Sequence, residues 1–238
     1  MGYALITGAS GGIGRELAAL FAADGHDLVI TARSQERLDM VKTKLEQRFG
    51  VHVVTFAIDL SEANAPKKLH DFTTSQGIAV DHLVNNAGFA DWTDFLDADW
   101  NRQNEMMQLN MHALAELTYR YGRDMRANGH GRILNISSVA SMMAGPYMAM
   151  YFASKAFVRS LSEAVAHELR GTGVTMTKPA TARQLATYAY RRMMRGSTLA
   201  YHGPLTKAGA LAERVLPRAL TRRIAAFMNG GKPHTLKV

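Results

Sequence analysis

The chain alternates short apolar runs with longer stretches in which apolar residues recur at intervals of three and four positions. The short runs predict β-strands, and the longer stretches predict amphipathic helices. Strands are expected at residues 3–7, 27–31, 51–57, 82–85, 132–137, 174–177 and 198–202. Helices are expected at residues 13–23, 35–49, 100–125 and 149–170, among others. Strands that alternate with helices form a parallel sheet covered on both faces, so the pattern predicts a doubly wound α/β fold.

The composition is that of one ordinary globular domain. Of the 238 residues, 47% are hydrophobic and 20% are charged, and no repeat or linker divides them. The chain contains no cysteine, which excludes disulfides, thiolate metal sites and cysteine nucleophiles, and which suits a reducing compartment. The first strand begins too early for a signal peptide, and no apolar run reaches the length of a membrane span. We therefore expect a cytoplasmic protein.

The net charge of +8 is unevenly distributed along the chain. Residues 178–238 hold twelve of the 28 Lys and Arg residues but only one acidic residue, Glu213. The rest of the chain is slightly acidic. Because the basic excess is confined to the C-terminal quarter, it does not predict a nucleic-acid-binding surface.

The segment TGASGGIG at residues 7–14 joins the first predicted strand to the first predicted helix. Glycine permits a tight turn and a close approach of the backbone, and the helix N-terminus offers free N–H groups to phosphate. This context predicts a Rossmann-type turn that binds a dinucleotide, whereas a flexible turn without a ligand is the alternative. The residues expected to bind the cofactor here are Gly8, Ser10, Gly12, Ile13 and Gly14.

The end of the second predicted strand indicates which dinucleotide binds. An acidic residue there would accept hydrogen bonds from the adenosine ribose and would repel a 2′-phosphate. The chain has Arg33 instead, which can pair with the phosphate while Ser10 or Ser34 adds a hydroxyl. This favours NADP(H) over NAD(H). A solvated arginine at a helix entrance is the alternative.

Over about residues 1–177, the chain resembles the short-chain dehydrogenase/reductase family. The glycine turn is similar to the TGxxxGxG motif of that family, and NNAG at residues 85–88 is similar to the motif after its fourth strand. The positions of the family's catalytic tetrad are occupied by Asn110, Ser138, Tyr151 and Lys155. A helix-surface pair, a strand end and a polar helix residue are the alternatives for these residues taken singly, but their joint occurrence favours the tetrad.

The resemblance implies several further properties. The Rossmann-type sheet should have seven strands in the order 3-2-1-4-5-6-7, and the long helices at 100–125 and 149–170 should build a homodimer or homotetramer. Lys155 should also hold the nicotinamide ribose, and Asn110 should position a water molecule in a proton relay. The other cofactor contacts that the resemblance implies are Asp59 and Leu60 near adenine, and Asn86, Ala87 and Gly88 near the ribose.

The chemistry of the tetrad can also be argued from the residues themselves. Tyr151 and Lys155 are four positions apart, so they share one face of a helix. A free phenol has a pKa of about 10, and a nearby ammonium favours its ionised form. Tyr151 would donate a proton to a carbonyl oxygen as hydride reaches the carbon. Ser138, at a strand end, would hydrogen-bond the same oxygen.

Two segments rich in Met and aromatic residues border the expected mouth of the site, at residues 89–95 and 142–148. Loops at the C-terminal ends of parallel strands are where such folds bind ligands. The two segments predict an apolar, adaptable pocket in which Trp92, Met142 and Tyr147, with Ser138 and Tyr151, contact a hydrophobic carbonyl compound. Ordinary core or subunit packing is the alternative.

After the sixth predicted strand, the chain departs from the family pattern. The family has a Pro-Gly turn and a substrate-covering segment there, whereas this chain has Pro179-Ala180. Since this dipeptide opens a helix-like pattern, we expect the strand to lead almost directly into the next helix. Either the natural chain carries a covering segment that this sequence lacks, or the segment is truly deleted and the site is open.

Residues 204–238 are expected to form a basic amphipathic helical extension of the domain in residues 1–203. Apolar residues recur at helical spacing between positions 205 and 227, basic residues occupy another face, and Pro217 should kink or divide the helix. Such a segment can make peripheral contact with an anionic membrane or bind an acidic partner. Packing against its own domain or another subunit is the alternative.

Together these features predict an NADP(H)-dependent reductase or alcohol dehydrogenase acting on an apolar carbonyl/alcohol pair. The alternative from another class is an NADP-binding regulatory or scaffold protein that keeps the motifs but has lost turnover. The nine histidines show no ligand spacing such as HExxH, so no metal is expected.

Overall fold

The computed structural model describes residues 2–180, 185–196, 199–201 and 217–229. Its centre is a parallel sheet of seven strands in the order β3-β2-β1-β4-β5-β6-β7, as predicted. Six strands form the body of the sheet, and the short β7 pairs with the last three residues of β6. The strands are β1 Tyr3–Thr7, β2 Leu28–Ala32, β3 Val53–Ala57, β4 Val80–Asn85, β5 Gly131–Asn135, β6 Val174–Ala180 and β7 Leu199–Tyr201.

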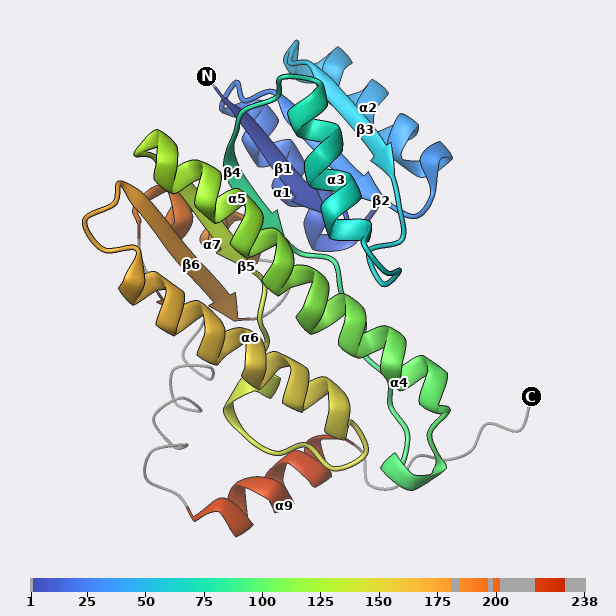
Figure 1. The fold of residues 1–238 in the computed structure, drawn as a ribbon. Helices are drawn as coiled ribbons and strands as arrows, with labels where there is room; N and C mark the ends of the chain where they lie inside the picture. Colours follow the sequence, from blue (N-terminus) through green and yellow to red (C-terminus); the bar gives the residue numbers. More distant parts are fainter. Residues whose placement is uncertain (1, 181–184, 197–198, 202–216, 230–238) are drawn as a thin grey trace.

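Helices cover both faces of the sheet (Figure 1). The α1, α2 and α7 helices pack on one face, and α3, α5 and α6 pack on the other. The α-helices are α1 Gly12–Ala23, α2 Gln35–Phe49, α3 Ala65–Ser75, α4 Trp100–Met107, α5 Leu114–Asn128, α6 Ala149–Glu168, α7 Leu185–Met194 and α9 Arg218–Met228. Two 3₁₀ turns, η1 Phe95–Asp97 and η3 Val139–Met142, and a π-helical segment, η2 Gln108–Ala113, complete the described elements.

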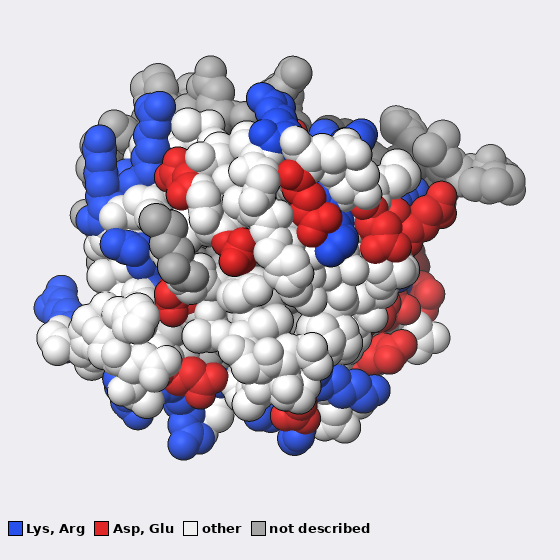
Figure 2. Space-filling model, turned by 90° about the horizontal axis from the view of Figure 1, so that it is seen from above, with Lys and Arg blue, Asp and Glu red and all other residues white. Residues whose placement is uncertain are grey.

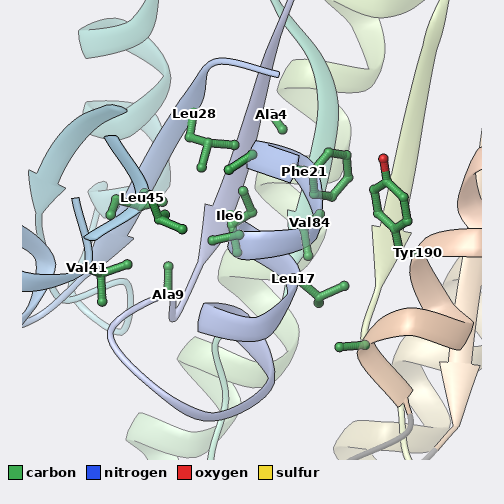
Figure 3. Close-up of a cluster of buried hydrophobic side chains, with 14 of the residues drawn as sticks. Ala4, Ile6, Ala9, Leu17, Phe21, Leu28, Val41, Leu45, Val84 and Tyr190 are labelled. Carbon is green, nitrogen blue, oxygen red and sulfur yellow. The ribbon is translucent and has the colours of Figure 1, made fainter. Parts of the chain in front are cut away.

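The strands divide their apolar side chains between two cores. In β1, Ala4 and Ile6 face the core under α1, α2 and α7, whereas Leu5 faces the core under α3, α5 and α6. Successive side chains of a strand point to opposite faces, so a strand buried on both sides is apolar at every position. In the first core, Phe21 of α1 lies against Tyr190 of α7 with ring centroids 4.8 Å apart (Figure 3). The C-terminal part of the chain thus contributes to the main core.

The second helix matches its predicted bounds because both of its ends carry a sequence signal. Ser34 is the N-cap, and its hydroxyl accepts a hydrogen bond from the backbone N–H of Arg37 at 3.3 Å. Gly50 follows the last turn with a φ of 69°, the left-handed conformation that glycine adopts without strain. These caps fix where the chain leaves β2 and where it enters β3.

Two of the predicted elements are wrong in detail. The helix predicted at 100–125 is divided, because η2 widens its middle into a π-helical turn. Pro179-Ala180 does not open a helix but continues β6, in which Pro179 is opposite Ala200 of β7. The next helix begins at Leu185. Residues 181–184 between them, and the predicted domain boundary at 203–204, lie outside the described residues.

A buried polar network joins the centre of the sheet to two helices. Asn85 at the end of β4 lies opposite Asn135 at the end of β5, and its side-chain amide donates to the Asn135 amide oxygen at 2.9 Å. The amide of Asn135 in turn donates to the Ser162 hydroxyl of α6 at 3.0 Å. Asn85 also donates to the Thr118 hydroxyl of α5 at 3.1 Å. These bonds connect the strand ends to the helices that carry the predicted catalytic residues.

The opposite end of the sheet holds a pair of buried histidines. The rings of His26 and His82 lie 4.6 Å apart, and a guanidinium nitrogen of Arg132 lies 3.3 Å from Nε2 of His82. The Nδ1 atoms of both histidines have no hydrogen-bond partner among the described residues. Burial, reinforced by the positive charges of His26 and Arg132, lowers the pKa of His82 to about 3. His82 is therefore neutral over the whole physiological pH range.

Candidate active site

The predicted glycine turn adopts the conformation that its glycines permit. Gly8 and Gly12 have φ values of 68° and 52°, which side-chain-bearing residues rarely adopt. Gly14 has no such angle, but a Cβ atom there would overlap the carbonyl oxygen of Gly8 and lie 2.6 Å from Nδ2 of Asn86. The turn brings the N-terminus of α1 to the end of β1, where its free N–H groups can bind phosphate.

Thr7 and Asn86 hold the end of β4 against this turn. The side-chain amide of Asn86 donates to the carbonyl oxygen of Thr7 at 2.9 Å. The backbone N–H groups of Asn86 and Ala87 both donate to the Thr7 hydroxyl at 2.9 Å. The first two predicted motifs, TGxxxGxG and NNAG, are therefore one hydrogen-bonded unit.

Asn110 lies in the π-helical segment and clamps the chain after the NNAG motif. Its amide donates to the carbonyl oxygen of Phe89 at 2.9 Å, and its amide oxygen accepts from the Phe89 N–H at 3.1 Å. The amide also donates to the Ser154 hydroxyl at 3.2 Å. A π-turn displaces a side chain from the α-helical stripe, and such turns are frequent at functional sites. Asn110 thus connects α6 to the loop that follows β4.

Ser138, Tyr151 and Lys155 converge from the end of β5 and the first two turns of α6. The Ser138 oxygen accepts a hydrogen bond from the Ala140 N–H at 3.2 Å, which leaves its own hydrogen free for another acceptor. The ammonium nitrogen of Lys155 lies 5.8 Å from the centre of the Tyr151 ring. It donates to the carbonyl oxygen of Ile136 at 3.1 Å, which ties α6 to the β5 end.

Lys155 is buried, and burial changes its protonation. Its side chain is only 6% exposed, and the loss of hydration lowers its pKa to about 8. It keeps its charge at neutral pH but is poised to lose the proton a little above it.

Of the predicted tetrad, Ser138, Tyr151 and Lys155 line one cavity, whereas Asn110 lies behind its wall and contacts Phe89, a lining residue. The volume of the cavity is about 570 Å³, within the range of small-molecule sites. One wall is the glycine turn with residues 86–90, and the other is formed by Ile136, Ser137, Ser138, Tyr151 and Lys155. A second cavity of about 300 Å³ shares Gly8 and residues 87–89 with the first and extends to the ends of β2 and β3. Together they form one continuous site along the C-terminal edge of the sheet.

A model of the family described as "short chain dehydrogenase" matches residues 2–184. This chain belongs to the short-chain dehydrogenase family. It is similar to a 7beta-hydroxysteroid dehydrogenase of Collinsella aerofaciens, with 27% identity over 172 residues, which are 72% of this chain and 65% of that protein. It is also similar to a very-long-chain 3-oxoacyl-CoA reductase of Neurospora crassa, with 33% identity over 175 residues, which are 72% of this chain and 53% of that protein.

A solved short-chain dehydrogenase from Sphingobium yanoikuyae, in complex with NADPH, has a similar fold. The similarity covers all of this chain and 98% of that one, with a TM-score of 0.81 and 27% identity. The matches to the two curated relatives, by contrast, span only about half to two thirds of their length.

The second cavity holds the residues predicted to select the cofactor of this short-chain dehydrogenase. Ser10, Arg33, Asp59 and Leu60 all line it. The side chain of Arg33 is 75% exposed, and its guanidinium lies 4.0 Å from the Asp59 carboxylate. Arg37 of α2 lines the same cavity and is a residue that sequence reasoning missed. Its position one helical turn beyond Arg33 is a signal that could have revealed it.

Of the predicted substrate residues, Ser138 and Tyr151 line the first cavity, whereas Trp92, Met142 and Tyr147 are not among its lining residues. Among the described residues, neither Trp92 nor Tyr147 lines the cavity of Tyr151, although the Thr93 N–H donates to the Tyr147 carbonyl oxygen at 2.8 Å and joins the two predicted loops. Met142 is buried and lines a different groove, between the start of α6 and α9. The substrate contacts of these three residues stay predictions.

The residues of the short-chain dehydrogenase fit a nicotinamide dinucleotide. The positive-φ glycines, the free helix N-terminus and the shared walls of the two cavities provide an elongated, backbone-lined cradle. Lys155, Arg33 and Arg37 place cations along it. Within the described part of the chain, no cluster of three His, Asp or Glu side chains is arranged to bind a metal ion.

Proposed function

We propose that this protein is an NADP(H)-dependent oxidoreductase that interconverts an apolar carbonyl compound and its alcohol. The observation that carries the proposal is that Ser138, Tyr151 and Lys155 face the glycine turn across a single cavity. A phosphate-binding turn alone would support a nucleotide-binding protein. The hydroxyl, phenol and buried ammonium beside it add the groups that a proton transfer needs.

In the direction of reduction, the bound nicotinamide would supply a hydride to the carbonyl carbon. Tyr151 donates its phenolic proton to the carbonyl oxygen, so the π bond of C=O is replaced by a C–H and an O–H bond while the C–O single bond remains. Ser138 donates a hydrogen bond to the same oxygen and fixes its position during the transfer. Lys155 stabilises the phenolate that remains on Tyr151. Oxidation of the alcohol reverses each step.

Three features support NADP(H) as the cofactor. The end of β2 carries Arg33 where an acidic residue would repel a 2′-phosphate. Arg37 brings a second guanidinium to the same cavity, and the hydroxyl of Ser10 lies among its lining groups. The similar dehydrogenase from Sphingobium yanoikuyae was solved with NADPH.

The names of the relatives support an apolar substrate, because one acts on a steroid and another on a very long acyl chain. The cavity of Tyr151 is consistent with this, since its lining includes the apolar side chains of Ile13, Phe89 and Ile136. A homodimer remains part of the proposal. A groove between α5 and α6, which lie side by side in Figure 1, offers the surface for it.

The proposal is tested by turnover of a panel of apolar ketones, followed by NADPH absorbance. Tyr151→Phe should lower kcat/KM about 100-fold to 10,000-fold, the range expected for loss of a proton donor. Tyr3→Phe is the matched control, because Tyr3 lies at the start of β1, at the end of the sheet opposite to the cavity, and the change should leave turnover unchanged. Binding of NADPH without Tyr151-dependent turnover of any ketone would instead indicate an NADP-binding regulatory or scaffold protein.

Cofactor choice is tested separately by equilibrium binding. Arg33→Ala and Arg37→Ala should each weaken NADPH binding about 10-fold to 100-fold, as expected for a charge-assisted hydrogen bond, with little effect on NADH. Arg48→Ala, on the exposed last turn of α2 and at the other end of that helix from Arg37, is the control. Equal losses for the two nucleotides would reject the proposed phosphate contact.

A further inference from the structure

The α9 helix turns its larger apolar side chains away from the protein. Leu220, Ile224 and Phe227 are 44%, 40% and 86% exposed, and their spacing of four and three residues places them on one face. Ala225, which is 2% exposed, faces the domain instead. The alternative in which the tail packs against its own domain or another subunit stays a prediction, but these three side chains are exposed in the described part of the tail. The exposed stripe needs another apolar environment.

Basic side chains accompany this stripe. Arg222 and Arg223 are exposed in the middle turn of α9, where Arg223 is next to the stripe and Arg222 lines the groove toward α6, and the helix contains no acidic residue. The residues that line the groove between α9 and α6 also include no acidic side chain. By contrast, the end of the molecule seen from above, at the start of the strands, shows Lys and Arg interspersed with Asp and Glu (Figure 2). The combination of an apolar stripe and unopposed arginines is typical of a helix that lies at an anionic lipid surface.

Contacts with the rest of the structure hold α9 in place. The side-chain amide of Asn229, just after the helix, donates to the carbonyl oxygen of Pro146 at 2.8 Å. Pro146 belongs to the loop between Ser138 and Tyr151, and Figure 1 shows α9 beneath that loop, beyond the C-terminal ends of the strands. The stripe therefore projects from the end of the molecule that carries the candidate active site.

The η1 turn is also exposed and apolar, but it differs from α9 in the charges of its neighbouring side chains. Phe95 and Leu96 are 47% and 89% exposed in η1, but Asp94 and Asp97 flank them in the sequence. An anionic surface would repel this segment. Within the described part of the chain, α9 is the exposed apolar element whose own charges are all positive.

We propose that α9 is an interfacial anchor that binds the protein to anionic phospholipid membranes. Leu220, Ile224 and Phe227 enter the boundary between headgroups and acyl chains, while Arg223 beside them pairs with lipid phosphates or carboxylates. The anchor does not cross the bilayer: none of the described helices combines the length and the apolarity that a transmembrane span requires. The proposal does not depend on the cofactor or substrate of the site.

Flotation of the full chain with lipid vesicles tests the anchor. The protein should float with vesicles made of equal parts of phosphatidylcholine and phosphatidylserine, and much less with phosphatidylcholine alone. Phe227→Ser should weaken binding about 10-fold or more, because a phenyl ring no longer leaves water. Arg223→Gln should weaken binding about 5-fold. Added salt should weaken the wild type.

Leu96→Ser is the matched control, because Leu96 is as exposed as Phe227 but has acidic neighbours, and it should float like the wild type. Circular dichroism confirms that each variant is folded. The proposal is overturned if the wild type does not float with anionic vesicles, or if Phe227→Ser floats equally well. It is also overturned if Phe227→Ser leaves flotation unchanged but dissociates an oligomer in sedimentation, since the stripe is then a subunit interface.

Discussion

At the scale of single residues, the burial of the Lys155 ammonium lowers the stability of the fold but provides the charge that the proposed reaction uses. An ammonium that is 6% exposed, with a carbonyl oxygen as its hydrogen-bond partner, loses much of its hydration on folding. Its pKa falls from an ordinary value of 10.5 to about 8, so the folded state resists its charged form. The corresponding cost below pH 8 is about 3 kcal/mol. As the pH rises from 8 to 10.5, the folded chain gives up this proton before the unfolded chain does, and the cost disappears.

We therefore expect Lys155→Met to be more stable than the wild type at pH 7, by up to about 3 kcal/mol, and to lose about 100-fold or more in kcat/KM. Urea unfolding at pH 7 and pH 10 measures the first effect, and the gain should shrink at the higher pH. Lys68→Met, on the exposed surface of α3, should change neither quantity. A variant that is less stable than the wild type at pH 7 would contradict this account of Lys155.

At the scale of elements, the turn from β1 to α1 contains one glycine at which a Cβ atom fits and another at which it does not. A Cβ at Gly14 would overlap the Gly8 carbonyl and crowd Asn86, whereas a Cβ at Gly11 would meet no atom within 4 Å. The φ of Gly11 is −172°, an extended angle open to any residue. Gly14→Ala should therefore lower the free energy of unfolding by about 1–3 kcal/mol and weaken dinucleotide binding. Gly11→Ala should leave the free energy of unfolding unchanged. Thermal unfolding of both variants compares them directly, and equal stability would contradict the close approach at Gly14.

Elements with local signals were predictable from the sequence. The α2 helix has a capping serine and a terminal glycine, and β1 ends at the glycine turn, so their bounds match the prediction. The π-turn of η2 was not predictable, because apolar residues still recur at helical spacing through it. The extension of β6 through Pro179 depends on pairing with β7, a partner distant in the sequence. Long-range pairing leaves no local signature in such a short segment.

The candidate site also has a part that was predictable from the sequence and a part that was not. The glycine turn and the Ser138, Tyr151 and Lys155 set have fixed spacing, and the structure brings them to one cavity. Substrate contacts have no such spacing. Met residues suit a core and a ligand pocket equally well, and Met142 lies in a groove on the far side of its loop.

At the scale of the whole molecule, the buried histidine pair makes stability depend on pH. His26, His82 and Arg132 bring three basic groups from different elements to one end of the sheet. The pKa of His82 is lowered to about 3, while an unfolded chain has an ordinary value of 6.5. Between these values the unfolded state binds one more proton than the folded state, so stability falls as the pH falls. From pH 7 to pH 5 the expected loss from His82 is about 2 kcal/mol.

In urea unfolding, the free energy of unfolding of His82→Leu should fall by about 2 kcal/mol less between pH 7 and pH 5 than that of the wild type. This holds even if the variant differs in stability at pH 7. His112→Leu is the control, because His112 is 66% exposed. If the wild type and His82→Leu lose the same free energy between pH 7 and pH 5, His82 is not the group responsible.

The Asn85–Asn135 pair has a consequence for engineering the protein. A slip of β4 against β5 by one residue would leave two amides unpaired in the core, a far larger penalty than a slip between apolar strands. The pair thus fixes the register of β4 against β5, directly beneath the loops that follow both strands. The parts of those loops after residue 90 and after Ser138 can be replaced to bind new ligands, and the groups that line the cavity should keep their positions.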